Sequence, residues 1–280
     1  MGNDPRAAPG HQSSAVESEV PARQKSDDAL LQIDNISMTY RARRGMIEAL
    51  ASLSINVGRG EFVSVIGPSG CGKSTVLKIT AGLLRPTSGR VILDARPITG
   101  PRRDVGIAFQ KPTLLPWKSV LENVLLPTKA LKLEPAMARE RAQELLQLVG
   151  LSKFEHNYPG ELSGGMQQRV GLARMLAHDP TFLLMDEPFA ALDAMTREAL
   201  AVELQRIWLN TKKSVLFITH SIPEAVFLSD RVVVMSARPG RVLEQVSIAL
   251  PRPRTPDTMA GEAFGKICLH LRHDFAESAG

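Results

Sequence analysis

The stretch Gly67-Pro68-Ser69-Gly70-Cys71-Gly72-Lys73-Ser74-Thr75 decides the fold, because it matches the pattern G-x-x-x-x-G-K-[ST] of phosphate-binding P-loops. Residues 62–66 before it predict a short buried strand, and residues 76–83 after it carry apolar side chains at helical spacing. A loop between a strand and a helix directs backbone N–H groups and the positive end of the helix dipole into one small space. Lys73 adds a charge for the phosphates of a nucleotide, and the Ser74 hydroxyl suits Mg²⁺.

Length and composition bound the class of protein. The 280 residues suffice for one large α/β domain or two small ones. Hydrophobic residues make up 44% and charged residues 22%, which predicts a packed core. The net charge of +5 suits phosphate ligands or an anionic membrane surface and selects neither. Two cysteines indicate a reducing compartment rather than a disulfide framework. We see no secretory signal and no apolar run near the ~20 residues of a membrane-spanning helix.

Patterns along the chain predict three parts. Residues 1–28 are rich in Pro, Ser, Ala and charge without periodicity, and we expect a disordered tail there. Residues 29–250 alternate strand and helix patterns and predict the folded domain, with a helical insertion over about residues 111–165. Residues 251–280 are first rich in Pro and Arg and then helical, which predicts a partly helical C-terminal extension.

Helix-capping residues mark four of the predicted helix starts. Ser119 with Glu122 and Ser221 with Glu224 have the spacing of capping boxes. Ser163 and Asp193 are plausible N-caps of two more helices.

An acidic pair at a strand end is the second candidate element of a site. Residues 182–185 form a continuous apolar run, as buried parallel strands do, and Asp186 and Glu187 follow. In an open α/β sheet, ligands bind at the edge where the strands end. Asp186 can hold Mg²⁺ directly or through water, and Glu187 can orient or deprotonate an attacking water. The alternative, an acidic pair in solvent, is disfavoured by the P-loop on the same chain.

Further motifs resemble one known family. The stretch Leu162-Ser163-Gly164-Gly165 resembles the signature of the nucleotide-binding subunits of ATP-binding cassette (ABC) transporters. Gln110 matches the Q-loop glutamine of that family, and residues 191–193 match its D-loop. His220 matches its switch histidine, and Tyr40 matches the aromatic residue that stacks on adenine. The likeness spans about residues 30–246.

Two departures from the family pattern are small. Met166 stands where many members have Gln, and Ser221 stands where many have Asp. Neither removes a group that the mechanism requires, so we expect an active ATPase.

The resemblance implies a fold and a set of roles. The fold is α/β, with a P-loop NTPase (RecA-like) sheet core, an antiparallel β subdomain and an inserted α-helical subdomain, which makes residues 29–250 an ABC ATPase domain. The implied cofactors are ATP and Mg²⁺, and the implied metal-binding residues are Ser74, Gln110 and Asp186. The implied catalytic residues are Glu187, His220, Gln110 and Lys73. Nucleotide contacts are implied for Tyr40, residues 67–75, Ser163 and Gly165.

The family also implies an assembly. One P-loop and one signature occur in the chain, so a two-site machine needs two copies. In the implied head-to-tail homodimer, Ser163 and Gly165 of one copy contact the γ-phosphate bound to Lys73 of the other.

Three segments indicate a subtype. Residues 109–117, 186–189 and 236–241 are similar to nitrate/sulfonate/taurine-type importer ATPases. This likeness implies a separate integral membrane permease, an extracytoplasmic solute-binding protein, no nucleic acid partner, and a peripheral place on the cytoplasmic face of the inner membrane. Trp117 would lie near the groove that accepts the coupling helix of the permease, or else it belongs to the core.

Three rivals stay open on sequence grounds. A P-loop kinase would need an acceptor site and has no use for the signature at residues 162–165. A cassette ATPase of DNA repair or chromosome structure usually carries long insertions that this chain lacks. Only the three subtype segments argue against an ABC exporter or lipoprotein-release ATPase.

Overall fold

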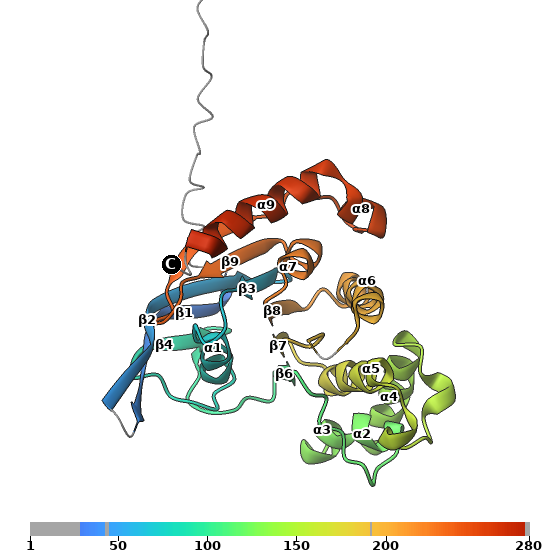
Figure 1. Ribbon diagram of the computed structural model, residues 1–280. Coiled ribbons are helices and arrows are strands. Elements are labelled where there is room, and N and C mark those ends of the chain that lie inside the picture. Colours follow the sequence, from blue (N-terminus) through green and yellow to red (C-terminus); the bar gives the residue numbers. More distant parts are fainter. Residues whose placement is uncertain (1–28, 43–44, 191, 278–280) are drawn as a thin grey trace, which may run out of the picture.

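The structure is a computed structural model that describes residues 29–42, 45–190 and 192–277. Two sheets and a set of helices make up the described chain (Figure 1). Residues 1–28, for which we expect a disordered tail, and Ala191 of the expected D-loop lie outside these ranges. Within the described ranges, no helix is long and apolar enough to cross a membrane.

The larger sheet has six strands in the order β10-β9-β3-β8-β7-β6. Neighbouring strands from β9 to β6 are parallel, whereas β10 pairs with β9 in the antiparallel sense. This sheet is the α/β core expected around the P-loop, and its strands are β3 (Phe62–Ile66), β6 (Val105–Ala108), β7 (Phe182–Asp186), β8 (Ser214–Ile218), β9 (Arg231–Met235) and β10 (Val242–Ser247).

The central strands are apolar on both faces because the sheet is covered on both sides. Phe62 and Ile66 of β3 pack in the cluster with the helical region, and the alternate residues Val63 and Val65 pack in the cluster with the second sheet. In Figure 1, α7 (Ile222–Leu228) and α9 (Glu262–Glu277) lie on one side of β3 and β9, and α1 (Lys73–Thr80) lies on the other.

The second sheet is antiparallel, as the family resemblance implies. Its order is β2-β1-β4-β5, with β1 (Ala29–Ala42), β2 (Gly45–Gly58), β4 (Ser88–Leu93) and β5 (Arg96–Pro97). Residues 31–33 and 36–38 each have a strand pattern, which predicts two strand pieces where the structure has the single strand β1. The reason is a register shift between Ile33 and Ile36, where Asn35 has a φ of 47° and interrupts the alternation of buried residues.

The helical insertion lies beyond the β6 edge of the larger sheet (Figure 1). Its helices are α2 (Val120–Val124), α3 (Leu126–Ala130) and α4 (Pro135–Leu148), with short 3₁₀ turns at Ser152–Phe154 and Pro159–Glu161. The helix α5 (Gly164–Leu176) packs against them and runs past the end expected for the insertion, at about residue 165. The Ser119 box is complete, since Ser119 Oγ accepts from Glu122 N and the Glu122 carboxylate accepts from Ser119 N. Ser163 caps α5 by accepting from Met166 N at 3.3 Å.

Two helices follow the strands that carry the candidate site. Asp193 caps α6 (Ala194–Thr211), accepting from Thr196 N at 3.0 Å. Ser221 caps α7, but this second capping box is only half formed. Ser221 Oγ accepts from Glu224 N, whereas the Glu224 carboxylate accepts from Thr219 Oγ1 at 2.7 Å instead of returning to the cap.

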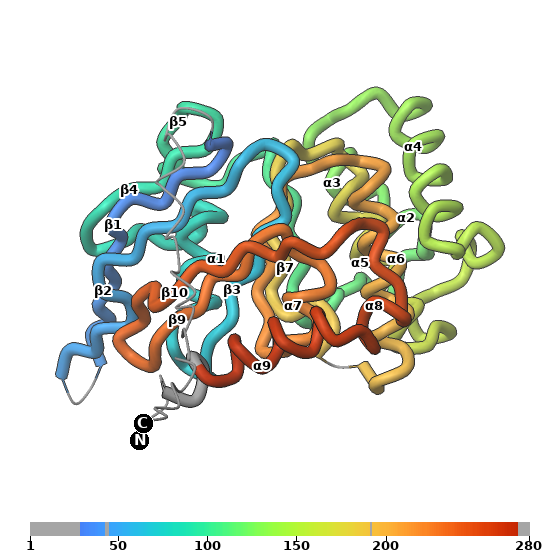
Figure 2. Tube along the Cα trace, turned by 90° about the horizontal axis from the view of Figure 1, so that it is seen from above, coloured from blue at the N-terminus to red at the C-terminus, as the bar shows by residue number. Residues whose placement is uncertain are grey.

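The segment after residue 250 is tied into the core by a buried arginine. The Arg254 side chain is 2% exposed, and its guanidinium donates to backbone carbonyls at the end of α7 and after β10, namely those of Val226, Phe227, Ser229, Ile248 and Leu250. Burial lowers the pKa of Arg254 to about 10, so the side chain stays charged at neutral pH. From there α8 (Pro256–Ala260) leads into α9, which crosses over the sheet (Figure 2).

We expect the variant Arg254→Ala to lower the free energy of unfolding by about 3 kcal/mol or more, because each buried carbonyl left without a donor costs roughly 1–3 kcal/mol. Urea denaturation measures the loss. Arg272→Ala is the matched control, because Arg272 is exposed on α9. Equal free energies of unfolding for the two variants would show that the buried guanidinium does not stabilise the fold.

Candidate active site

The strand order brings the predicted site residues to one edge of the larger sheet. Parallel strands end at the same edge, and β3, β8 and β7 are neighbours there. The P-loop follows β3, His220 follows β8, and Asp186 and Glu187 end β7. Segments far apart in the sequence therefore meet in one place.

The P-loop wraps the start of α1 in a conformation that needs glycine. Gly72 is the N-cap with a φ of 102°, and a Cβ there would lie 2.6 Å from Leu50 Cδ2. The Lys73 side chain is buried, and its Nζ donates to Gly67 O at 2.7 Å and to Pro68 O at 2.9 Å. The third contact of Lys73 Nζ is to Cys71 Sγ at 3.8 Å, and a thiol is a weak acceptor that a phosphate oxygen can replace.

The acidic pair faces the P-loop. Ser74 Oγ donates to Asp186 Oδ1 at 3.3 Å, so the two residues expected at a metal lie side by side. Burial raises the pKa of the Asp186 carboxyl above its usual range, although the bond from Ser74 opposes the shift.

Glu187 is held in an unusual backbone conformation next to the histidine. Its φ is 45°, and its N–H donates to Ile218 O at the end of β8, 2.8 Å away. His220 Nδ1 lies 3.1 Å from Glu187 Oε2. The strained backbone and this anchoring hold the Glu187 carboxylate beside His220, at the pocket that the P-loop lines.

The P-loop and Glu187 line an open pocket of about 450 Å³, within the usual size range of small-molecule sites. Asp186 and His220 do not line it but lie beside lining residues, Asp186 next to Ser74 and His220 next to Glu187. Lys73, Ser74 and Glu187 are among the lining residues, and Tyr40 and Ile47 contribute an aromatic and an apolar side chain. The Tyr40 hydroxyl lies 3.2 Å from Thr75 Oγ1, which anchors the ring beside the P-loop. A pocket with a cationic phosphate cradle and an aromatic wall suits a nucleotide.

The donor set next to the P-loop fits Mg²⁺. A hydroxyl and a carboxylate are hard oxygen ligands, which Mg²⁺ prefers, and Ser74 and Asp186 present both together. Gln110, the third residue implied for the metal, is exposed just after β6 and does not line the pocket.

The structure separates the signature from the pocket. Ser163 and Gly165 begin α5, and neither residue lines the pocket of the same chain. Gly165 is close to α6 instead, since a Cβ there would lie 2.8 Å from Thr196 Cγ2. Six of the nine P-loop residues line the pocket. Gly67, Pro68 and Cys71 do not, and Cys71 is buried.

Three pocket residues were not predicted. Ile47, Ala49 and Arg238 also line it, although they lie far from the P-loop in sequence. The only signal was that Arg238 belongs to residues 236–241, a segment noted for its likeness to one importer subtype.

A partly buried ion pair joins the first turn of α6 to α7 near the site. Arg197 Nε lies 3.5 Å from Glu224 Oε1, and Arg197 also donates to Leu192 O at 3.1 Å. Glu224 in turn accepts from Thr219, the neighbour of His220. Burial raises the pKa of Glu224, and Arg197 opposes that shift.

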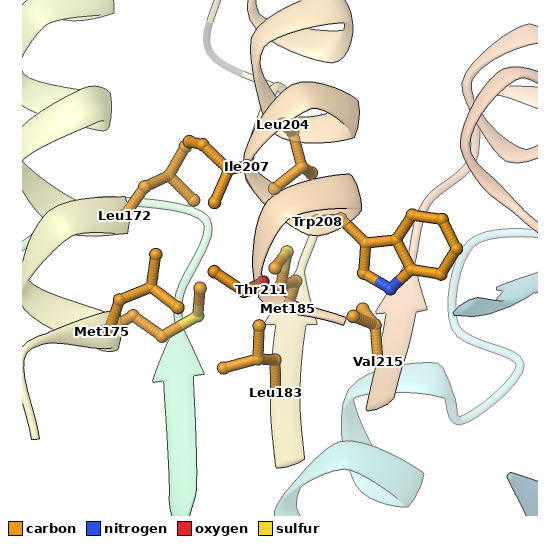
Figure 3. Close-up of a pocket in the computed structure, with 10 residues that line it drawn as sticks. Leu172, Met175, Leu183, Met185, Leu204, Ile207, Trp208, Thr211 and Val215 are labelled. Atoms are coloured by element: carbon orange, nitrogen blue, oxygen red, sulfur yellow. The ribbon is translucent and has the colours of Figure 1, made fainter. Parts of the chain in front are cut away.

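A second cavity, of about 10 Å³, lies within the core and is too small for a nucleotide. Figure 3 shows Leu172 and Met175 of α5 on one side of it and Ile207 of α6 on the other, with Leu183 and Met185 of β7 also in the lining. It is a packing gap between α5, α6 and the sheet, lined almost wholly by apolar side chains.

A P-loop, a carboxylate pair and a histidine at one edge of a mainly parallel sheet define a nucleoside-triphosphate hydrolase of the P-loop class. The sequence pattern of the family described as "ABC transporter" matches residues 50–190. The chain belongs to this ABC transporter family, as an ATP-binding subunit with ATPase activity.

Relatives and solved structures support this assignment. The chain is 47% identical over 224 residues to the taurine import ATP-binding protein TauB of Burkholderia pseudomallei, covering 80% of this chain and 86% of that protein. It is 42% identical over 243 residues to the aliphatic sulfonates import ATP-binding protein SsuB of Bacillus cereus, covering 87% and 94%. The ATP-binding cassette MJ0796, solved as a dimer in a post-hydrolysis state with ADP and Pi, matches with a TM-score of 0.69 and 34% identity over 79% of this chain and 100% of that one.

Proposed function

We propose that two copies of this chain clamp two ATP molecules in a head-to-tail dimer. Hydrolysis of the ATP then energises the uptake of a small solute, such as taurine, another sulfonate or nitrate, through a separate membrane permease. The observation that carries this proposal is the incomplete pocket. One chain supplies the P-loop and Glu187 to the lining, with Asp186 bonded to Ser74 beside them, but its own signature at Ser163 and Gly165 lies outside the lining.

A second copy can complete the pocket. Ser163 caps α5, a helix of 13 residues, and the N–H groups at such a helix start attract anions. In the proposed dimer this helix start faces the γ-phosphate held by Lys73 of the other copy. The dimeric state of the similar cassette MJ0796 supports this arrangement.

The residues of one chain have distinct tasks in the proposed reaction. Lys73 and the P-loop bind the phosphates, and Tyr40 holds the base. Glu187 takes a proton from the attacking water, and His220, next to its carboxylate, orients it and holds the γ-phosphate. Ser74 and Asp186, with Gln110, would hold Mg²⁺, which when bound neutralises charge on the phosphates.

The permease is proposed to dock on the helical insertion. Trp117 is 70% exposed, so the alternative that it belongs to the core is wrong. Tyr158 is 50% exposed and lies in a neighbouring loop, because Val120 N donates to Asn157 O at 2.8 Å. Exposed aromatic side chains are favoured at protein interfaces, and this pair suits the coupling helix of a permease. The subunit then sits on the cytoplasmic face of the inner membrane, and an extracytoplasmic binding protein delivers the solute.

Mixed dimers test the shared pocket. The variant Ser163→Asp keeps a good helix cap but places a carboxylate against the phosphate, so we expect it to be inactive. Lys73→Ala is expected to be inactive as well. A mixture of the two forms dimers with one intact pocket, and its phosphate release should rise well above that of either variant alone.

Ser163→Asn is the control, because it caps α5 without adding charge and should keep most of the activity. A mixture as inactive as its components, with both variants folded, would exclude a pocket shared between two copies.

Import can be tested separately from hydrolysis. The subunit is reconstituted with its permease in proteoliposomes, and the binding protein with its solute is supplied on the side opposite ATP. We expect solute-dependent stimulation of ATPase and accumulation of solute. Stimulation by a substrate placed on the ATP side would favour an exporter instead.

A further inference from the structure

The loop between β9 and β10, residues 236–241, is held against the P-loop. A Cβ at Gly240 would lie 2.1 Å from Cys71 O, so only a glycine allows the two backbones to approach this closely. Gly240 N donates to Ala49 O at 2.9 Å, and Gly240 O accepts from Ala51 N at 3.1 Å. The loop is therefore packed between the P-loop and β2.

Arg238 extends from this loop to the nucleotide pocket. Its Nη2 and Nε lie 3.1 Å and 3.3 Å from Gly70 O, and the residue lines the pocket together with Lys73 and Tyr40. Its side chain is exposed. Among the described residues, no carboxylate forms an ion pair with Arg238, so its charge is not neutralised by the protein.

Arg241 belongs to the same loop and shows that a place in this loop does not by itself bring an arginine to the pocket. Arg241 is also exposed and lies three residues further along the same loop. Its backbone exchanges hydrogen bonds with Ser236, but the residue does not line the pocket.

We propose that Arg238 is a further nucleotide-binding residue, whose guanidinium contacts the phosphate chain of bound ATP. A guanidinium has five N–H donors in a rigid fork that matches phosphate oxygens, and the bonds to Gly70 O leave donors free. Arg238 thus supplies a second positive charge to the pocket, on the side of Gly70, while Lys73 supplies the first from within the P-loop. The proposal rests on ATP occupying this pocket.

The test separates a phosphate contact from simple support of the P-loop. Gln at position 238 keeps an amide that can donate to Gly70 O but carries no charge. We therefore compare the wild type, Arg238→Gln, Arg238→Lys and the control Arg241→Gln by equilibrium binding of ATP in EDTA, which prevents hydrolysis. The Kd is measured at several salt concentrations.

Arg238→Gln should weaken ATP binding about tenfold, as expected for the loss of one charged hydrogen bond. The dependence of its Kd on salt should also become flatter. Arg238→Lys should recover part of the affinity, and Arg241→Gln should bind like the wild type.

Two results would overturn the role of Arg238. One is wild-type affinity in Arg238→Gln. The other is a loss of affinity with an unchanged salt dependence, since that loss would come from the shape of the loop. A wild-type protein that binds no ATP would instead refute nucleotide occupancy of the pocket.

Discussion

Replacing Glu187 by Gln is expected to lower the rate of ATP hydrolysis roughly 10²–10⁴-fold while ATP still binds. The carboxylate is fixed by a backbone φ of 45°, by the bond from Glu187 N to Ile218 O and by His220 at 3.1 Å. Gln has nearly the same shape and keeps these constraints, so the loss isolates the proton-accepting oxygen. Phosphate release at saturating ATP gives the rate, and equilibrium binding gives the affinity.

Glu140→Gln is the matched control, because Glu140 is exposed on α4 and does not line the pocket. It should leave both quantities unchanged. Near-normal turnover in Glu187→Gln would exclude Glu187 as the base for the attacking water. His220 would then be the next candidate for that role.

The second large effect is expected for Lys73→Ala. Lys73 Nζ donates to Gly67 O and Pro68 O and makes a weaker contact with Cys71 Sγ at 3.8 Å, so the ammonium is held in place before a ligand arrives. Such preorganised charge is typically worth about 10²–10³ in rate, and here it also contributes to binding. We expect hydrolysis to fall at least roughly 10²-fold and ATP affinity to weaken, as measured by phosphate release and equilibrium binding.

Lys73 is buried, so the variant also leaves two carbonyls without a donor, and its unfolding must be measured alongside. Lys266→Ala is the control, because Lys266 is exposed on α9 and pairs with Glu262 at 2.7 Å. A folded Lys73→Ala protein with unchanged turnover would contradict the proposed phosphate contact.

The sequence predicts the parts of the site that depend on local order. The P-loop and the Asp186–Glu187 pair each follow a strand, and parallel strands end at one edge, so their meeting near Ser74 is predictable. The sequence does not predict Arg238, because its position depends on how the β9–β10 loop packs on the P-loop.

Two further predictions from local sequence patterns differ from the structure. The spacing of Ser221 and Glu224 predicts a complete capping box, yet the Glu224 carboxylate is drawn to Thr219 and Arg197, which no local pattern reveals. Similarly, the register shift at Asn35 interrupts the strand pattern, so the sequence does not predict that β1 is one continuous strand. The roles of Gln110, Ser163 and Gly165 depend on a ligand or a second copy and stay predictions.

The ion pair between Arg197 and Glu224 has a mechanical consequence. It joins the start of α6, through Leu192 O, to the turn that carries His220. Separating the two would leave a buried charge without its partner, which is costly. We therefore expect a displacement of the first turn of α6 to move the segment that carries His220, so that a neighbour which never touches the pocket can change its geometry.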